Sequence, residues 1–306
     1  TVRRLVTTLG MKRAEELGMI LPHEHVFVDL RTWNQPGYAQ AETADVIRLM
    51  VPELQKAQAA GVSALVECSP VGVGRRADIL KAVSEAANFP LVVPTGIYRD
   101  AWIPSWARRE NEADLADWML EELEEEIEGS GVRAGFIKLG ASDEGLTADE
   151  EKILRAAARA ARQTGVVIGS HTINWDVVLN QVRILEACGL PLDRFIWIHA
   201  MAQAGIDLNL ELARRGTWIE YDFLGSEETD NDALQRIQRM ADAGLLGRVL
   251  ISHDRGWFDP AQPGGGIPQP YTHISQHFLP RLRDAGFSDE EIEQITCRNP
   301  FEAFAR

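Results

Sequence analysis

Cysteines, basic residues and long apolar runs are all scarce in this sequence of 306 residues. The three cysteines, Cys68, Cys188 and Cys297, are far apart and lack C-x-x-C spacing, which argues against a disulfide framework and favours buried free thiols in a reducing compartment. No apolar run approaches the ~20 residues of a membrane span, and the first residues lack the apolar stretch of a signal peptide. We therefore expect a cytoplasmic protein without a membrane partner.

The charge balance is acidic, with 31 Lys and Arg against 46 Asp and Glu and a formal net charge of −15. Such a chain lacks the clustered positive charge that nucleic acid or an anionic membrane requires of a main partner. The hydrophobic fraction of 45% is average for a globular protein, so the chain can bury a sizeable core. A folded protein that acts on a small molecule fits this composition.

Short apolar or β-branched runs alternate with longer segments of helical periodicity, a pattern typical of a parallel sheet with crossover helices. Eight such runs are found, at Met19–Val28, Ala64–Cys68, Leu91–Ile97, Gly135–Leu139, Val166–Ser170, Phe195–Ile198, Thr217–Tyr221 and Val249–Ser252. Eight strands predict a (β/α)8 TIM barrel, an α/β fold that uses roughly 250 residues or more as a single unit. We therefore expect residues 1–306 to form one domain.

Helix signals between these runs support the count. Thr147 with Glu150 and Ser288 with Glu291 have the spacing of capping boxes, and Gly165 is placed as a helix stop.

Two other segments stand out between the strands. The acidic run Glu121–Glu128 has Leu123 and Ile127 on its other face, which predicts a solvated helix surface rather than a cation site. The long Gly- and Pro-rich loop from Arg255 to Tyr271 follows the eighth strand, where it is expected to cover the active-site face.

Histidines stand at the carboxyl ends of the predicted strands. His23 and His25 are two apart, so a strand points both imidazoles to one side and Glu24 to the other. Each histidine alone is more often structural than a ligand, but a set at one rim matches the imidazole and carboxylate preference of a borderline divalent ion. The set comprises His23, His25, His171, His199 and Asp254. The remaining histidines, His253, His273 and His277, are left outside it.

The chemical state of Lys138 indicates whether the site holds one metal ion or two. It lies within the apolar run GFIKLG, where an unpaired ammonium is costly to bury. One alternative is a salt bridge to a buried acid such as Glu67. The other is reaction with carbon dioxide to a carbamate, an anion that bridges two ions and balances their charge together with Asp254 and a hydroxide.

The chain resembles the phosphotriesterase-like family of the amidohydrolase superfamily. The resemblance spans nearly the whole chain and rests on EELGMILPHEHVFVD, GFIKLG, the SHT, IHA and ISHD strand ends, and ITCRNPFEAF. It implies that His23, His25 and Asp254 hold the more buried metal and that His171 and His199 hold the more exposed one. Carbamylated Lys138 and a hydroxide would bridge the two metals. Family members most often carry zinc, with cobalt, manganese or iron as replacements.

The resemblance implies a hydrolase and a homodimer, with the bridging hydroxide attacking an ester bond and Asp254 accepting the released proton. A lactone or carboxylic ester is the expected substrate, with promiscuous hydrolysis of organophosphate triesters. Tyr98 stands where lactonases of this group place a tyrosine beside the metals, and it is expected to be catalytic with Asp254 and Lys138. IHAMAQAGID, however, lacks the acidic residue usual after the strand-six histidine, which weakens the acyl-homoserine-lactone interpretation.

Substrate contacts are expected from loops at the same rim. The candidates are Tyr98, Arg99, Tyr221, Asp222, Trp257 and Phe258. Tyr98 could instead cap its loop, Arg99 could pair with Asp100 or a helix acid, and the aromatic residues could pin the long loop. Two other functions compete with the ester hydrolase: an amide or ring-amine hydrolase with one or two metals, and a barrel that binds metal without catalysis.

Overall fold

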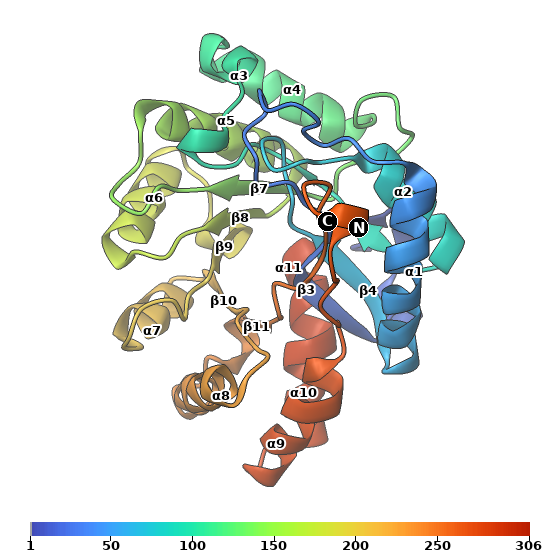
Figure 1. The fold of residues 1–306 in the computed structure, drawn as a ribbon. Helices are drawn as coiled ribbons and strands as arrows, with labels where there is room; N and C mark the ends of the chain where they lie inside the picture. The colour runs from blue at the N-terminus through green and yellow to red at the C-terminus, as the bar shows by residue number, and fades with distance from the viewer. Residues whose placement is uncertain (1) are drawn as a thin grey trace.

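The computed structural model describes residues 2–306 as a parallel barrel surrounded by helices (Figure 1). The barrel strands are β3 (Met19–Phe27), β4 (Val62–Glu67), β5 (Leu91–Val92), β6 (Pro94–Thr95), β7 (Phe136–Gly140), β8 (Ile168–His171), β9 (Phe195–Ile198), β10 (Trp218–Tyr221) and β11 (Val249–Ile251). β5 and β6 are two parts of the third predicted strand, interrupted at Val93, so the eight expected strand positions are all filled. The (β/α)8 barrel expected from the sequence is confirmed.

Parallel pairing runs in two arcs, β6-β7-β8-β9-β10-β11 and β12-β3-β4-β5, with β12 spanning Gly256–Phe258. The third strand belongs to both arcs because β5 and β6 are its two halves. The seam between β11 and β3 is closed by hydrogen bonds to the carbonyl of His23, from Ser252 Oγ at 2.9 Å and from the Asp254 N–H at 3.1 Å. The carboxyl ends of the strands therefore meet at one rim.

Helices follow the strands and cover the outside of the barrel (Figure 1). They are α1 (Thr43–Ala59), α2 (Ala77–Ala87), α3 (Ser105–Arg109), α4 (Glu112–Glu124), α5 (Ala148–Thr164), α6 (Trp175–Ala187), α7 (Asp207–Arg214), α8 (Glu227–Asp242), α9 (Leu279–Asp284), α10 (Asp289–Glu293) and α11 (Asn299–Phe304). The capping boxes before α5 and α10 are present, and Gly165 ends α5 in a left-handed conformation, as predicted. None of the helices in residues 2–306 is long and apolar enough to cross a membrane.

The core has two layers. Side chains such as Val66, Phe136 and Leu250 fill the inside of the barrel, and a larger layer packs between the sheet and the helices. The two ends of the described chain meet, because Arg4 and Arg306 exchange backbone hydrogen bonds of 2.9 and 3.1 Å.

Three features differ from the sequence-based expectations. The segment from Arg255 to Tyr271 is not a plain loop, since it begins with β12, which extends the sheet beside β3. The acidic run is not wholly solvated: Glu122 is buried and makes bidentate bonds of 2.6 and 2.7 Å to Arg75. A small hairpin of β1 (Leu5–Thr7) and β2 (Gly10–Lys12) precedes the barrel.

Candidate metal centre

Six side chains singled out in the sequence converge at the carboxyl-terminal rim of the barrel. They are His23 and His25 of β3, Lys138 of β7, His171 of β8, His199 after β9 and Asp254 after β11. Together with Cys68, Tyr98, Trp257, Val28, Leu30 and Val73 they line a cavity of about 150 Å³. This is where active sites lie in barrels of this type.

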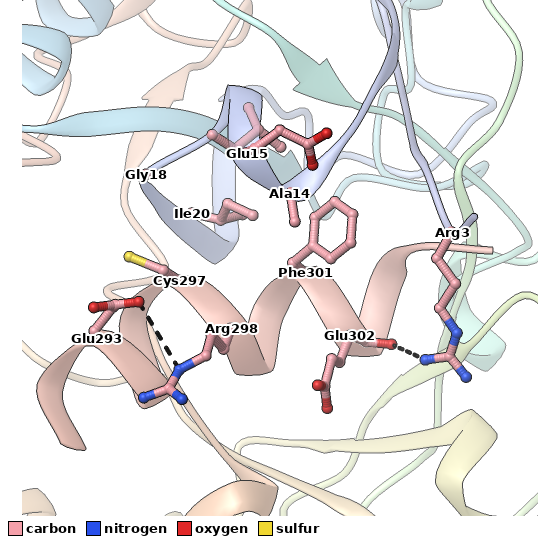
Figure 2. Close-up of a pocket in the computed structure, with 11 residues that line it drawn as sticks. Arg3, Ala14, Glu15, Gly18, Ile20, Glu293, Cys297, Arg298, Phe301 and Glu302 are labelled. Carbon is pink, nitrogen blue, oxygen red and sulfur yellow. Dashed lines mark hydrogen bonds and ion pairs between the residues drawn. The ribbon is translucent and has the colours of Figure 1, made fainter. Parts of the chain in front are cut away.

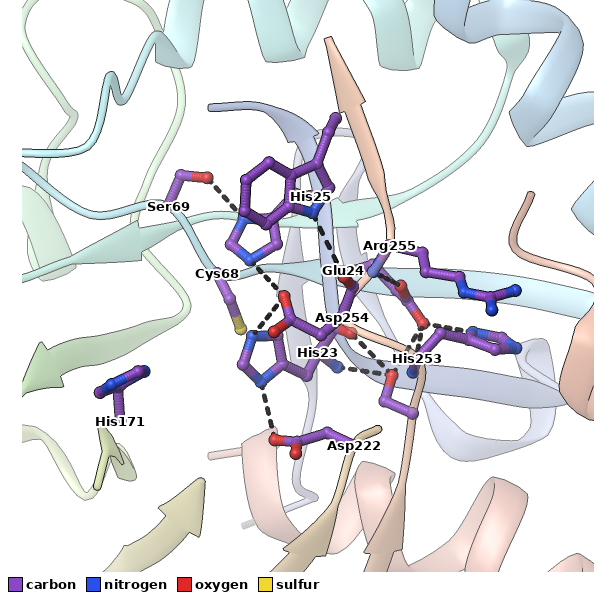
Figure 3. Close-up of polar contacts among 12 residues, drawn as sticks. His23, Glu24, His25, Cys68, Ser69, His171, Asp222, His253, Asp254 and Arg255 are labelled. Carbon is purple, nitrogen blue, oxygen red and sulfur yellow. Dashed lines mark hydrogen bonds and ion pairs between the residues drawn. The ribbon is translucent and has the colours of Figure 1, made fainter. Parts of the chain in front are cut away.

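The imidazoles of His23 and His25 both face the cavity, as the two-residue period of a strand requires (Figure 3). Asp254 reaches them from the opposite side of the seam: its Oδ1 lies 2.9 Å from His25 Nε2 and 3.4 Å from His23 Nε2. Nitrogen and oxygen ligand atoms of His23, His199 and Asp254 all lie within 4.8 Å of one another. Two imidazoles and a carboxylate at this spacing suit a divalent ion.

The outer nitrogens of the histidines are occupied by other partners. His23 Nδ1 lies 2.9 Å from Glu220 and 3.1 Å from Asp222, and His25 Nδ1 lies 2.7 Å from Ser69 Oγ. These partners fix the rings and direct each Nε2 into the cavity, as is usual for metal-binding histidines. The cluster of His23, Glu220 and Asp222 is therefore better described as a hydrogen-bonded support than as a second ion site.

His171 points its buried Nε2 into the cavity, and no hydrogen-bond partner for this atom is found in residues 2–306. Its Nδ1 contacts the Tyr98 hydroxyl at 3.2 Å. Burial, reinforced by His199 and Lys138, lowers the pKa of His171 well below its ordinary value, which favours the neutral form that binds metals. A buried polar atom without a partner is unusual and fits a ligand position.

His199 and Asp254 share an uncommon backbone conformation, with φ of +65° and +58°. Left-handed conformations cost roughly 1–2 kcal/mol per residue in L-amino acids and persist where surrounding contacts enforce them. For His199 the contact is Asp222, whose two oxygens accept from the His199 N–H at 3.0 Å and contact its Nδ1 at 2.9 Å. Burial raises the pKa of Asp222, but His199 and His23 outweigh it and hold the pKa below its ordinary range.

Lys138 is 2% exposed, and its ammonium reaches the carbonyl of Leu139 at 3.5 Å and the face of Tyr98 at 5.4 Å. The expected alternative of a salt bridge to Glu67 is not formed. Glu67 instead accepts from the Val26 and Ser69 N–H groups and lies 3.5 Å from His25. Burial lowers the pKa of Lys138, since its charged form lacks an ion-pair partner among the described residues.

Two of the six candidate substrate contacts line the cavity. Tyr98 lies over Lys138, and burial raises its pKa to about 12, so its hydroxyl stays a donor at neutral pH. Trp257 packs edge-on against His25 at a ring distance of 5.2 Å. Arg99 stands outside the cavity lining and pairs with Asp143 at 2.6 Å, rather than with Asp100 or a helix acid.

The other three candidates do not face the cavity, and the expectation for them is corrected. Tyr221 is buried and donates to Asn209 at 3.2 Å, away from the rim. Asp222 is fully buried behind His23 and His199 and supports them. Phe258 is buried against Phe27, with rings stacked at 5.7 Å, because β12 turns its side chain outward from the barrel mouth.

Sequence reasoning missed Glu220, Ser69 and Cys68. Glu220 could have been found from its spacing, since it precedes Asp222 by two residues and a strand points both to one side. Burial raises the pKa of Glu220 to about 8. Cys68 in the cavity lining and Ser69 beside His25 carry no such signal, because their positions depend on β4 lying beside β3.

A larger cavity, of about 640 Å³, lies near the opposite end of the barrel (Figure 2). It is formed between the start of β3 and the last helices, with Ile20, Phe301 and Cys297 in its wall and arginines and glutamates at its edges. It holds none of the clustered histidines. Size alone therefore does not identify the active site.

Comparisons with known proteins agree with the geometry. The model of the phosphotriesterase family matches residues 3–304. The phosphotriesterase homology protein of Escherichia coli is 29% identical over 94% of this chain and 98% of its own length, and an N-acetyltaurine hydrolase of Xenopus tropicalis is 25% identical over 97% and 96%. A solved variant of a phosphotriesterase-like lactonase from Deinococcus radiodurans superposes with a TM-score of 0.86 and 30% identity, covering 98% of this chain and 99% of that one. The chain belongs to the phosphotriesterase family.

Proposed function

We propose that this hydrolase binds two divalent cations at the barrel mouth and cleaves an ester bond, with a lactone or carboxylic ester as its substrate. The observation that carries the proposal is the convergence of four histidines and Asp254 around a buried lysine that has no ion-pair partner in the described chain. Zinc is the proposed metal, with cobalt, manganese or iron as functional replacements.

Lys138 would serve as the bridging ligand after carbamylation. The ammonium first loses one proton to water, which burial favours; the neutral amine then forms a bond to the carbon of carbon dioxide and releases a second proton, so that an unpaired cation becomes an anion. His23, His25 and Asp254 would hold one metal ion, and His171 and His199 would hold the other. When bound, such a metal pair activates a water at neutral pH and polarises the substrate oxygen.

The chain's own groups supply the remaining steps. Asp254 Oδ1 lies 2.9 Å from His25 Nε2 and 3.4 Å from His23 Nε2, where its carboxylate would accept the proton released in the reaction. The Tyr98 hydroxyl is placed to donate to a substrate oxygen. Trp257, Leu30 and Val73 form an apolar wall that excludes water around the reacting bond. The small cavity favours a compact reacting group.

The test is a panel of lactones, aryl esters, phosphotriesters and N-acyl amides, assayed with protein loaded with zinc or cobalt. We expect the highest kcat/KM for a lactone or carboxylic ester, weak turnover of phosphotriesters, and loss of both in His171→Ala. His277 is exposed and lies outside the cluster, so His277→Ala is the matched control and should keep full activity. An amide preferred over every ester would replace this proposal with the amide hydrolase, which the similarity to an N-acetyltaurine hydrolase supports. No hydrolysis by metal-loaded protein would favour a barrel that only binds metal.

A further inference from the structure

Glu24 lies between the two histidines of β3 and points to the other side, away from the cavity (Figure 3). Its carboxylate is fully buried and faces a set of donors from the end of β11. Its Oε1 accepts from the His253 N–H at 3.0 Å and from His253 Nδ1 at 2.5 Å, and lies 2.9 Å from Ser252 Oγ. Its Oε2 accepts from the Arg255 N–H at 2.8 Å. The carboxylate thus holds the backbone on both sides of Asp254.

Asp254 is the residue whose backbone needs this support. Its φ of +58° lies in the left-handed region, and its own N–H donates to the carbonyl of His23 at 3.1 Å. The carbonyl of Arg255 accepts from the His25 N–H at 2.8 Å. Three successive residues after β11 are therefore fixed to β3, and the Asp254 side chain is directed at His23 and His25.

The bond between Glu24 and His253 also has a defined polarity. His253 Nε2 accepts from the Ile274 N–H at 2.9 Å, so the ring proton resides on Nδ1 and is donated to Glu24. Both nitrogens of His253 are occupied, which explains why this histidine supports the site without joining the ligand set.

A second candidate ligand also has a buried carboxylate beside it, which here contacts the ligand residue itself. Asp222 contacts both the backbone N–H and the ring of His199, the other ligand with a left-handed backbone. Each strained ligand position is therefore paired with a buried carboxylate from the neighbouring part of the barrel. A strained backbone conformation persists only where the surrounding contacts enforce it. A buried carboxylate beside each left-handed candidate ligand therefore supports a positioning role for these carboxylates.

We infer that Glu24 is a positioning residue that fixes the backbone of Asp254 in its metal-binding direction. The inference rests on the proposed function, in which Asp254 is a ligand. Replacement by glutamine keeps the size of the side chain but leaves one oxygen, so its NH₂ group must face either Arg255 N–H or the donors of His253. The backbone next to Asp254 would then lose one of its acceptors.

The experiment compares Glu24→Gln with the wild type by hydrogen exchange of residues 253–255 in metal-free protein and by Co²⁺ affinity with its visible absorption spectrum. We expect faster exchange in that segment, about 10- to 100-fold weaker Co²⁺ binding, and an altered spectrum. Glu122→Gln is the matched control: it also alters a buried carboxylate with several hydrogen bonds, to Arg75 and Thr95, but lies on α4 away from the cluster. It should leave both readouts unchanged.

The inference is overturned if folded Glu24→Gln binds Co²⁺ within twofold of the wild type, or if Glu122→Gln loses as much affinity. Unchanged exchange at residues 253–255 would overturn it as well. Should Glu24→Gln fail to fold, Glu24→Asp, which keeps the charge but withdraws both oxygens by one methylene, is expected to show the same changes. A wild type that binds no Co²⁺ would refute the proposed function, while the exchange measurement would still show whether Glu24 holds this segment.

Discussion

Lys138→Met should have opposite effects on the metal-free and metal-loaded protein. In the metal-free state the ammonium is 2% exposed and lacks an ion-pair partner in the described chain, so its burial costs stability. Methionine fills a similar volume without a charge, and we expect a stabilisation of about 1–4 kcal/mol, the upper range found when buried ion pairs are replaced by apolar groups. For a chain of 306 residues, that corresponds to a rise in Tm of about 2–6 °C.

Added metal should reverse the order of the two proteins. A ligand at a thousand times its Kd stabilises a protein by about 4 kcal/mol. The wild type should gain this stability from bound metal, whereas Lys138→Met lacks one of the proposed metal ligands and should gain less. Thermal unfolding with and without zinc measures both effects. Lys152→Met is the control, since that lysine is paired with Asp149 at 3.0 Å and should lose up to about 1 kcal/mol in either state. A metal-free Lys138→Met protein less stable than the wild type would refute the reasoning.

Four further substitutions test other parts of the site and the fold. Tyr98→Phe should lower kcat/KM about tenfold without changing the metal content. Tyr221→Phe breaks a hydrogen bond to the buried amide of Asn209, so it should leave kcat/KM unchanged and lower the free energy of unfolding in urea by about 1 kcal/mol. Phe258→Ala should lower the free energy of unfolding by about 3–5 kcal/mol and leave KM unaltered. A changed KM would indicate that Phe258 contacts the substrate after all. Burial raises the pKa of Asp29, but Arg31 and backbone N–H groups outweigh it and hold the pKa low. Asp29→Asn should therefore lower the free energy of unfolding by about 1–2 kcal/mol at pH 7, and this difference from the wild type should vanish as the pH falls through the lowered pKa of Asp29.

The cluster of candidate ligands could be predicted from the sequence because it depends on local order. Strand ends are marked by apolar runs, and parallel strands bring their carboxyl ends to one rim, so His171, His199 and Asp254 are brought together without knowledge of any contact. The direction of side chains within β3 follows from the period of a strand, which places His23 and His25 inward.

The contacts that the sequence did not predict depend on tertiary packing. Phe258 appeared to belong to a loop, but β12 pairs with β3 and buries it. Asp222 lies at a strand end like the candidate ligands, yet His23 and His199 contact both of its oxygens. The partner of Glu122 lies far away in the sequence, so a run of acids with a helical period could not reveal it.

Metal content is the most direct test of the central claim. Protein prepared with zinc or cobalt should contain about two metal ions per chain by elemental analysis, and Lys138→Met should contain one or none. About one ion per chain in both proteins would contradict the bridging role of Lys138 and the binuclear centre, and would favour a mononuclear hydrolase of the same superfamily.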